Sequence, residues 1–294
     1  FAAGPVVVSP NGRMIAFVAV TQEGRTMLYL RPLDATSSKP LPGTEGASYP
    51  FWSPDSKWLG FFSAGKLRKV DVAGSPPVAI CDAGNGRGGT WSQVGMILFN
   101  PQPVGPIVAV SSAGGTPTVV TKIDTMRKES THRWPSFLPD GKHFLYFSRT
   151  ASFGAEAEGD ALFVASLDFK TNKMLMNTSG NALYASGYLL FMRGKTLLAQ
   201  AFDEASLELS GDPFTVAEEA INDPGFNLAV FSASQNGVLA YQTGTGLAGA
   251  RMMVVDRTGK ELGLVGDVIE NFVPRLSPDG KRLMVSIFEP TSRT

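Results

Sequence analysis

Short apolar blocks separated by polar turns recur along the whole chain. The blocks are rich in β-branched and aromatic side chains, as in residues 13–20 and 143–147, and Pro, Gly, Asn, Asp or Ser bounds each of them. Blocks of this length and composition are typical of buried β-strands. Because no segment shows a convincing amphipathic helical pattern, the chain is expected to be all-β.

One turn with a Ser-Pro-Asp-Gly-like sequence joins two apolar blocks again and again. Proline fixes φ at the first central position, Asp or Asn is tolerated next, and Gly supplies the positive φ that reverses the chain. Each copy therefore predicts a β-hairpin. Aligned on the turn position, the copies fall at Gly12, Ser56, Gly95, Gly141, Gly187, Gly237 and Gly280, which lie 44, 39, 46, 46, 50 and 43 residues apart.

A third and a weaker fourth strand are expected to follow each hairpin. The third strands are predicted at residues 26–33, 66–72, 106–111, 161–167, 196–202 and 251–255, and fourth strands at segments such as 77–80, 116–121 and 261–265. Four antiparallel strands with a period near 45 residues fit one blade of a β-propeller.

The sequence thus predicts a single β-propeller domain over residues 1–294. Its repeats are placed at about 6–50, 51–90, 91–135, 136–182, 183–230 and 231–275, with a partial repeat at 276–294. This count favours six four-stranded blades, with seven as the alternative.

Composition narrows the class of partner. The 26 Lys and Arg balance 26 Asp and Glu, which argues against binding of nucleic acid or an anionic membrane surface through general electrostatics. The apolar runs are too short to span a bilayer, so we expect a soluble piece that does not insert into a membrane. The start at Phe1 and the incomplete final repeat favour a segment of a longer protein, and a monomer is expected.

The repeat turn and its surroundings resemble a known group of proteins. The segment Ser277-Pro278-Asp279-Gly280-Lys281-Arg282-Leu283 is similar to TolB-like, WD-repeat-like (PD40-type) propellers of bacteria. Residues 31–34, 40–47, 86–91 and 132–135 resemble the propeller regions of bacterial membrane-anchored serine/threonine protein kinases. The resemblance implies an extracytoplasmic sensor or docking domain, in the periplasm or at the cell surface, whose parent carries the kinase activity.

Catalytic patterns are weak in this segment. There is no Gly-x-Ser-x-Gly motif and no kinase catalytic set, and two histidines, His132 and His143, do not make a convincing metal site. The carboxylates Asp55, Asp140 and Asp279 share one turn position, where Asp caps its own backbone. The single Cys81 is read as packing rather than as a nucleophile. We therefore expect neither a metal nor a cofactor nor enzymatic activity.

Binding is expected at one end of the ring. Connections from one blade's last strand to the next blade's first, and those between second and third strands, share one face, which we name the top face. Loops there are predicted at residues 81–90, 124–133, 148–160, 218–227 and 243–250, and Tyr49 stands among the stacking aromatic residues beside them. The candidate ligand-binding residues are Arg87, His132, Arg133, Trp134, Tyr184, Asp223 and Phe226.

The leading hypothesis is a non-catalytic propeller that binds a protein, peptide or envelope ligand through its top face. The alternative is a propeller enzyme, such as a cyclase, a lyase or a glycan-active enzyme, with its site at the channel mouth. On the binding hypothesis, replacing Arg133 and Trp134 by alanine is expected to weaken ligand capture and to leave the thermal midpoint nearly unchanged. Residues at the position four before the turn residue, Trp52, Trp91, Phe137, Leu183 and Leu276, are instead expected to pack between blades.

Overall fold

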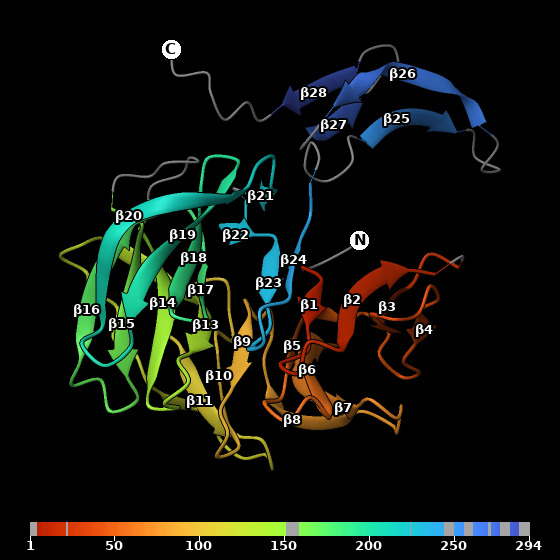
Figure 1. Cartoon of the computed structure of the whole chain (residues 1–294). Helices are drawn as coiled ribbons and strands as arrows, with labels where there is room; N and C mark the ends of the chain where they lie inside the picture. The colour runs from red at the N-terminus through yellow and green to blue at the C-terminus, as the bar shows by residue number, and fades with distance from the viewer. Residues whose placement is uncertain are drawn as a thin grey trace. The chain divides into compact units, whose positions relative to one another are not determined.

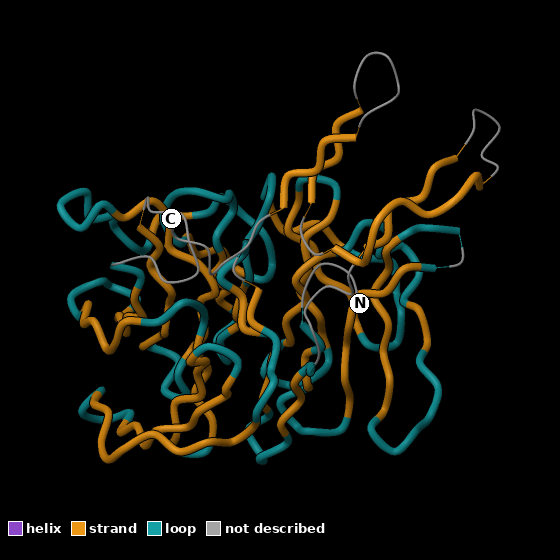
Figure 2. Tube along the Cα trace, turned by 90° about the horizontal axis from the view of Figure 1, so that it is seen from above, coloured by secondary structure: helices purple, strands orange, loops and turns teal. Residues whose placement is uncertain are grey.

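The computed structural model describes residues 5–21, 23–150, 159–223 and 225–243, and, as backbone alone, four strands between residues 250 and 287. Two compact units divide the chain, Phe1–Gln242 and Thr243–Thr294. The described residues form strands joined by turns and loops, with no helix among them (Figure 2). The all-β prediction is confirmed.

Five four-stranded antiparallel sheets make up most of the first unit (Figure 1). In each sheet the strands are hydrogen-bonded in chain order, so every sheet is a meander. The sheets are β1 (Val7–Val8), β2 (Met14–Val20), β3 (Thr26–Pro32) and β4 (Lys39–Pro40); β5 (Ser48–Trp52), β6 (Trp58–Ser63), β7 (Lys66–Asp71) and β8 (Val78–Asp82); β9 (Gly89–Trp91), β10 (Met96–Phe99), β11 (Val108–Ser111) and β12 (Thr118–Val119); β13 (Glu129–Phe137), β14 (His143–Thr150), β15 (Ala161–Ser166) and β16 (Asn172–Asn177); and β17 (Ala182–Ala185), β18 (Tyr188–Arg193), β19 (Thr196–Asp203) and β20 (Glu208–Ala217).

A sixth position in the ring is held by a two-stranded sheet. After the short hairpin β21 (Asn222–Asp223) and β22 (Leu228–Ala229), β23 (Phe231–Ala233) pairs with β24 (Leu239–Tyr241). The strand β23 contacts both β17 and β1. The Ser232 hydroxyl donates to the Val6 carbonyl at 2.8 Å and accepts from the Val8 amide at 2.9 Å, so the ring of first strands is closed.

The predictions of six or seven complete blades are therefore wrong, because five blades have four strands. The turn motif marks only the first hairpin of a repeat, and it cannot report whether a third and a fourth strand join that hairpin. In the second unit, β25 (Ala250–Val255) pairs with β26 (Glu261–Ile269), and β27 (Phe272–Leu276) pairs with β28 (Leu283–Ile287). The strands predicted at 251–255 and 261–265 thus form a two-stranded sheet of their own.

The repeat turns act as the sequence predicts. Their turn residues have positive φ, 63° at Gly141 and 60° even at the non-glycine Ser56. The Asp140 carboxylate accepts hydrogen bonds from the amides of Lys142 and His143, each at 2.9 Å. Asp55 does the same for Lys57 at 3.1 Å. The carboxylate series therefore has a backbone role in these two turns, while Asp279 lies outside the described residues.

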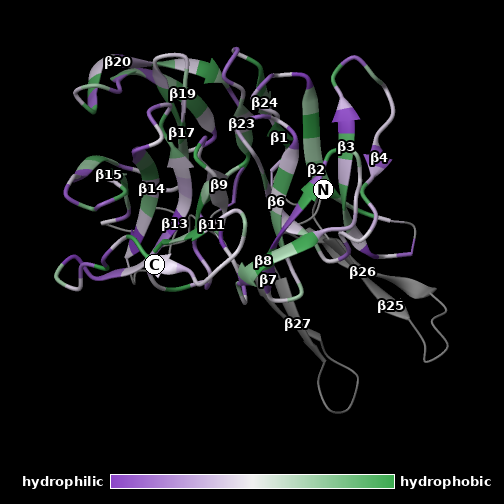
Figure 3. Cartoon of the chain, turned by 90° about the horizontal axis from the view of Figure 1, so that it is seen from below, coloured by the Kyte–Doolittle hydropathy of each residue, from purple (hydrophilic) through white to green (hydrophobic). Residues whose placement is uncertain are grey.

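The core consists of layers between neighbouring sheets. Figure 3 shows hydrophobic (green) stretches alternating with white and purple ones along the strands, and purple in many of the connecting turns. The Phe51 ring fills the space between two blades so closely that a Cβ at Gly60 would lie 2.3 Å from it, and one at Gly89 would lie 2.5 Å from it. Glycine at both positions is thus what lets a large ring enter this layer.

The residues four before the turn do pack between blades. Trp52 is buried, and its indole Nε1 donates to the Val7 carbonyl of the preceding blade at 3.0 Å. Trp91, Phe137 and Leu183 are half-buried against three different core clusters. The side chain of Leu276 lies outside those that the structure describes.

Candidate functional site

Four aromatic and arginine side chains from different positions of the ring meet at the top face. Tyr49 comes from β5, Arg87 from the segment before β9, Trp134 from β13 and Phe226 from the β21–β22 hairpin (Figure 1). The Tyr49 and Trp134 ring centroids lie 5.2 Å apart in an edge-to-face arrangement, and those of Tyr49 and Phe226 lie 6.3 Å apart. We call these four residues and Arg133 the mouth cluster.

Strained backbone aims two of these side chains at the cluster. Tyr49 and Trp134 have φ of 48° and 53°, an unusual conformation for large side chains, and each precedes a proline. Both sit where the strand register shifts, in β5 and in β13. A bulge redirects a side chain out of the alternating pattern of a strand. Backbone strain of about 1–3 kcal/mol per residue concentrates at functional sites.

The Arg87 guanidinium lies between two aromatic faces. Its Cζ is 5.7 Å from the centroid of the Tyr49 ring and 5.1 Å from that of Phe226, within the range of cation–π attraction. Its Nη1 donates to the side-chain and main-chain oxygens of Asn85 and to the Gly86 carbonyl. The backbone of Arg87 is also fixed, because its carbonyl accepts from the Trp134 amide at 3.2 Å.

Arg133 enters the same cluster from β13. Its Nη1 donates to the Phe226 carbonyl at 3.3 Å, and its Nη2 donates to the Pro103 carbonyl at 2.9 Å. The Trp134 Nε1 donates to that same Phe226 oxygen at 3.2 Å. A single backbone carbonyl thus receives donors from two neighbouring residues of one strand.

Burial and neighbouring charge perturb the titration of this cluster. Burial lowers the pKa of Arg133 to about 10, and the nearby Arg149 and Arg87 cations add to the effect. Burial also raises the pKa of the Tyr49 phenol, which Arg87 partly opposes. The pKa of Asp223 is raised by burial as well, although its carboxylate accepts from the Gly225 and Phe226 amides.

His132 points away from the mouth cluster. It is fully buried, its Nδ1 is 2.8 Å from the Thr121 hydroxyl, and its Nε2 is 3.0 Å from the Glu129 carboxylate. This Thr–His–Glu chain has the order of a catalytic triad, but the hydroxyl already accepts the Ile107 amide at 2.9 Å and lies beyond the reach of solvent. The chain links β13 to Thr121 in the segment that follows β12.

Tyr184 lies at the opposite end of the ring, which we name the turn face. Its ring packs edge-to-face on Phe202, and it lines a cavity of about 490 Å³ together with residues from all six ring positions. The lining is aromatic, proline-rich and uncharged, with Trp91, Phe137 and Gln235 among its members. Tyr184 therefore does not join Arg87, Arg133, Trp134, Asp223 and Phe226, the predicted residues that the structure brings together.

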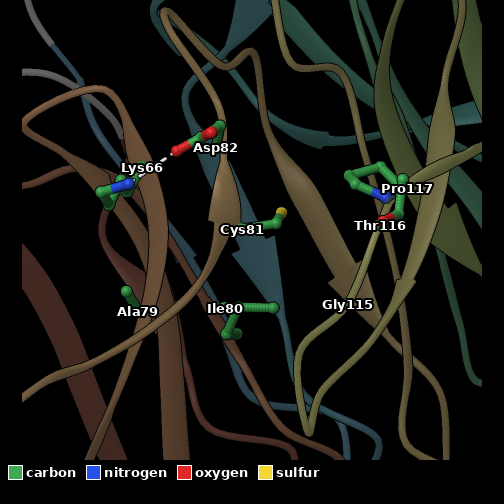
Figure 4. A pocket seen from close by; sticks show the side chains of 8 residues that line it. All are labelled: Lys66, Ala79, Ile80, Cys81, Asp82, Gly115, Thr116 and Pro117. Carbon is green, nitrogen blue, oxygen red and sulfur yellow. Dashed lines mark hydrogen bonds and ion pairs between the residues drawn. The ribbon is translucent and has the colours of Figure 1, made fainter.

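A second hollow, of about 360 Å³, lies between β8 and residues 115–117 (Figure 4). Cys81 points into it, and a Lys66–Asp82 ion pair of 2.6 Å stands at one end. Burial raises the pKa of the Cys81 thiol to about 11, so the thiol is protonated at neutral pH. This agrees with the interpretation of Cys81 as a packing residue.

The ligand-binding residues predicted from the sequence do not include several residues in and around the mouth cluster. Tyr49 was absent from the predicted ligand set, and Asn85 and the Pro103 carbonyl gave no signal. The pairs Tyr49-Pro50 and Trp134-Pro135, each followed by an aromatic residue and then the repeat turn, form a shared pattern that could have identified Tyr49. His132 and Arg133 were expected in a loop but lie on β13, because this nine-residue strand already begins at Glu129.

Within the described residues, no group of three His, Cys, Asp or Glu side chains could hold a metal ion. The same residues include no helix with the length and apolar character that a membrane crossing needs.

No protein-family model and no curated protein matches the chain in sequence. Solved structures do match it. TolB from Acinetobacter baumannii is 14% identical with a TM-score of 0.55, over 73% of this chain and 54% of that one. A putative TolB from Agrobacterium tumefaciens is 14% identical with a TM-score of 0.57, over 82% and 90%. A luciferin-regenerating enzyme is 12% identical with a TM-score of 0.51, over 84% and 87%.

A ring of radially arranged, four-stranded antiparallel sheets whose first strands surround a common axis defines this protein as a β-propeller. Within that class, the structural matches show that the fold is TolB-like. The chain spans about half the length of the A. baumannii TolB that it matches.

Proposed function

We propose that this propeller is a non-catalytic recognition module that binds a protein, peptide or envelope ligand at the mouth cluster of its top face. The observation that carries the proposal is the convergence of Tyr49, Arg87, Arg133, Trp134 and Phe226 from four positions of the ring. Aromatic and arginine side chains are the residue types that dominate protein interfaces energetically.

The backbone strain at Tyr49 and Trp134 supports the same assignment. A ring closed only for stability has no need of two large aromatic residues in left-handed conformations. The TolB-like fold suits a binding role as well, since its rigid blades hold loops from several repeats around one opening.

The proposal extends to the biological setting. The TolB-like fold and the resemblance of residues 86–91 and 132–135 to kinase-associated propellers support an extracytoplasmic sensor, part of a larger bacterial signalling protein such as a receptor-like serine/threonine kinase.

Site-specific photo-crosslinking tests the face that is used. A photoreactive amino acid is placed at Lys128 or Gly225, which are exposed in connections of the top face, and in matched variants at Gln93 or Asp140, which are exposed on the turn face. Each variant is expressed in a bacterial envelope and irradiated. We expect adducts from Lys128 and Gly225, and none from Gln93 and Asp140.

The outcomes separate the alternatives. Adducts that form equally from both faces, or only from the turn face, would overturn the assignment of binding to the mouth cluster. If none of the four positions gives an adduct, although circular dichroism shows that each variant is folded, the proposal of a protein or peptide partner is overturned.

An enzymatic propeller remains the second candidate because one similar structure is that of a luciferin-regenerating enzyme. Such an enzyme needs reacting groups that substrate can reach, whereas the His132 chain is enclosed. Alanine at Arg87 or Arg133 that abolished turnover of a small substrate would favour this candidate over simple binding.

A further inference from the structure

The mouth cluster contains two buried cations. Arg87 is 8% exposed and Arg133 is 5% exposed. In the part of the chain that the structure describes, neither guanidinium forms an ion pair, and the Nε of each has no hydrogen-bond partner. Buried charges are normally paired, because an uncompensated charge away from water is costly. The two arginines therefore leave positive charge that the described residues do not neutralise by direct contact.

Two described carboxylates that act electrostatically on the cluster accept hydrogen bonds from other groups. Asp160 accepts from both the amide and the hydroxyl of Thr150, at 2.8 and 3.1 Å. Asp223 accepts from the amides of Gly225 and Phe226. Burial raises the pKa of both aspartates, so their negative charge is itself disfavoured in place. Neither group substitutes for a direct counter-ion to Arg87 or Arg133.

The Phe226 carbonyl is an acceptor that two donors of the mouth cluster share. It accepts from Arg133 Nη1 at 3.3 Å and from Trp134 Nε1 at 3.2 Å, while the Phe226 ring covers the Arg87 guanidinium. Both hydrogen bonds are long for their type. An ionised acceptor forms shorter and stronger bonds with a guanidinium than a carbonyl does, and a carboxylate can engage it with two oxygens.

We propose that the mouth cluster binds a carboxylate group, which takes over the donors of Arg133 and Trp134 from the Phe226 carbonyl and lies against Arg87. This inference deepens the proposed function and rests on it. Among the described residues, the Arg149 cation adds to the positive potential at Arg133, and Asp160 opposes it.

The carboxylate can come from the C-terminus of a peptide or from an acidic side chain, and calorimetry with three peptides distinguishes the two. The probes are N-acetyl-Gly-Phe-Ala with a free C-terminus, the same peptide as its C-terminal amide, and the amide with glutamate in place of glycine. Binding of the first peptide alone identifies a terminal carboxylate, and binding of the third alone identifies a side chain. Equal affinity of the chain for all three, or no binding of any, overturns the inference.

A pair of matched variants tests the residues. Arg133→Met removes the buried cation and keeps an apolar side chain of similar length, so the fold is expected to survive. We expect this variant to lose about ten- to a hundredfold in affinity for the carboxylate peptide that binds. Arg68→Met on β7, another arginine whose Nε lacks a partner, is expected to change nothing. Equal affinity of the Arg133→Met and unmodified chains overturns the inference even where peptides bind.

Failure of this inference is distinguishable from failure of the proposed function. If Lys128 and Gly225 crosslink to a partner but the free and the amidated peptides bind alike, the proposal of recognition at the mouth cluster is supported. The proposal that a carboxylate is recognised is then refuted.

Discussion

Replacing Trp134 by alanine is expected to destabilise the first unit strongly, by about 3–5 kcal/mol. The indole is 7% exposed, packs on the edge of Tyr49, lies against Gly88 and donates to the Phe226 carbonyl. A buried tryptophan removes about 150–250 Å² from water, which at about 25 cal/mol per Å² corresponds to about 4–6 kcal/mol. The strained φ of 53° persists with alanine, so the substitution recovers little of that cost.

This expectation replaces the one drawn from sequence, in which alanine at Arg133 and Trp134 leaves the thermal midpoint nearly unchanged. For a unit of this size, each kcal/mol shifts the midpoint by about 2–4 °C, so Trp134→Ala lowers it by about 6–20 °C. Urea unfolding followed by far-UV circular dichroism measures the change without depending on the lost tryptophan. Trp134→Phe is the control, since it keeps an aromatic ring and loses the hydrogen bond, about 1 kcal/mol, together with only part of the buried surface.

A loss below about 1 kcal/mol for Trp134→Ala would refute the reasoning. It would mean that the indole contributes little to the closed ring and stands as an open platform for a ligand.

Three further predictions concern the scaffold. Gly60→Ala places a Cβ against the Phe51 ring and is expected to destabilise the unit by about 1–3 kcal/mol. In a double-mutant cycle measured by urea unfolding, Phe51→Leu in the same chain is expected to reverse part of this loss. Additive effects of the two substitutions would contradict the clash. Ala64 has φ of 50° in the two-residue turn Ala64-Gly65 between β6 and β7, so Ala64→Asn is expected to raise the midpoint by about 1–4 °C and Ala64→Val to lower it. The reverse order would be inconsistent with a left-handed turn position. Burial opposes ionisation of Glu129, but hydrogen bonds from His132 and the Asp124 amide outweigh it and lower its pKa to about 2. The stability that the ionised Glu129 contributes is therefore fully present above about pH 4.5 and falls by about 3 kcal/mol as the pH drops through about 2. Glu129→Gln should flatten that acid limb in urea titrations at pH 2–6, and an unchanged limb would show that other carboxylates cause it.

Local signals explain what the sequence could predict. Pro54, Asp55 and the turn residue Ser56 act within one hairpin, so their pattern reports a local structure wherever it occurs. The number of complete blades depends instead on whether distant strands pair, and no local motif encodes pairing on β24. The bulges at Tyr49 and Trp134 likewise reverse the faces that a period of two would give these side chains.

The grouping of the predicted residues followed from their shared position in the repeat, whereas their burial did not. Arg87 and Arg133 read as exposed loop residues because charged side chains are seldom buried. The two arginines are buried because Phe226 of the β21–β22 hairpin packs against Arg87 and accepts a hydrogen bond from Arg133. A contact between residues 93 positions apart, such as Arg133 with Phe226, has no signature in a single sequence.

The composition of the mouth cluster is better explained by recognition than by stability. Between the other blades, the same ring is packed with clusters of Leu, Phe, Val and Trp side chains that contain no charged group. Two guanidinium groups in place of such residues oppose folding, because each loses hydration that carbonyl oxygens only partly restore. If ring closure were their purpose, Arg133→Met would keep every function and could raise the midpoint. If ligand capture is their purpose, the same variant keeps or raises the midpoint while it loses binding, and measuring both quantities on one protein decides between the two.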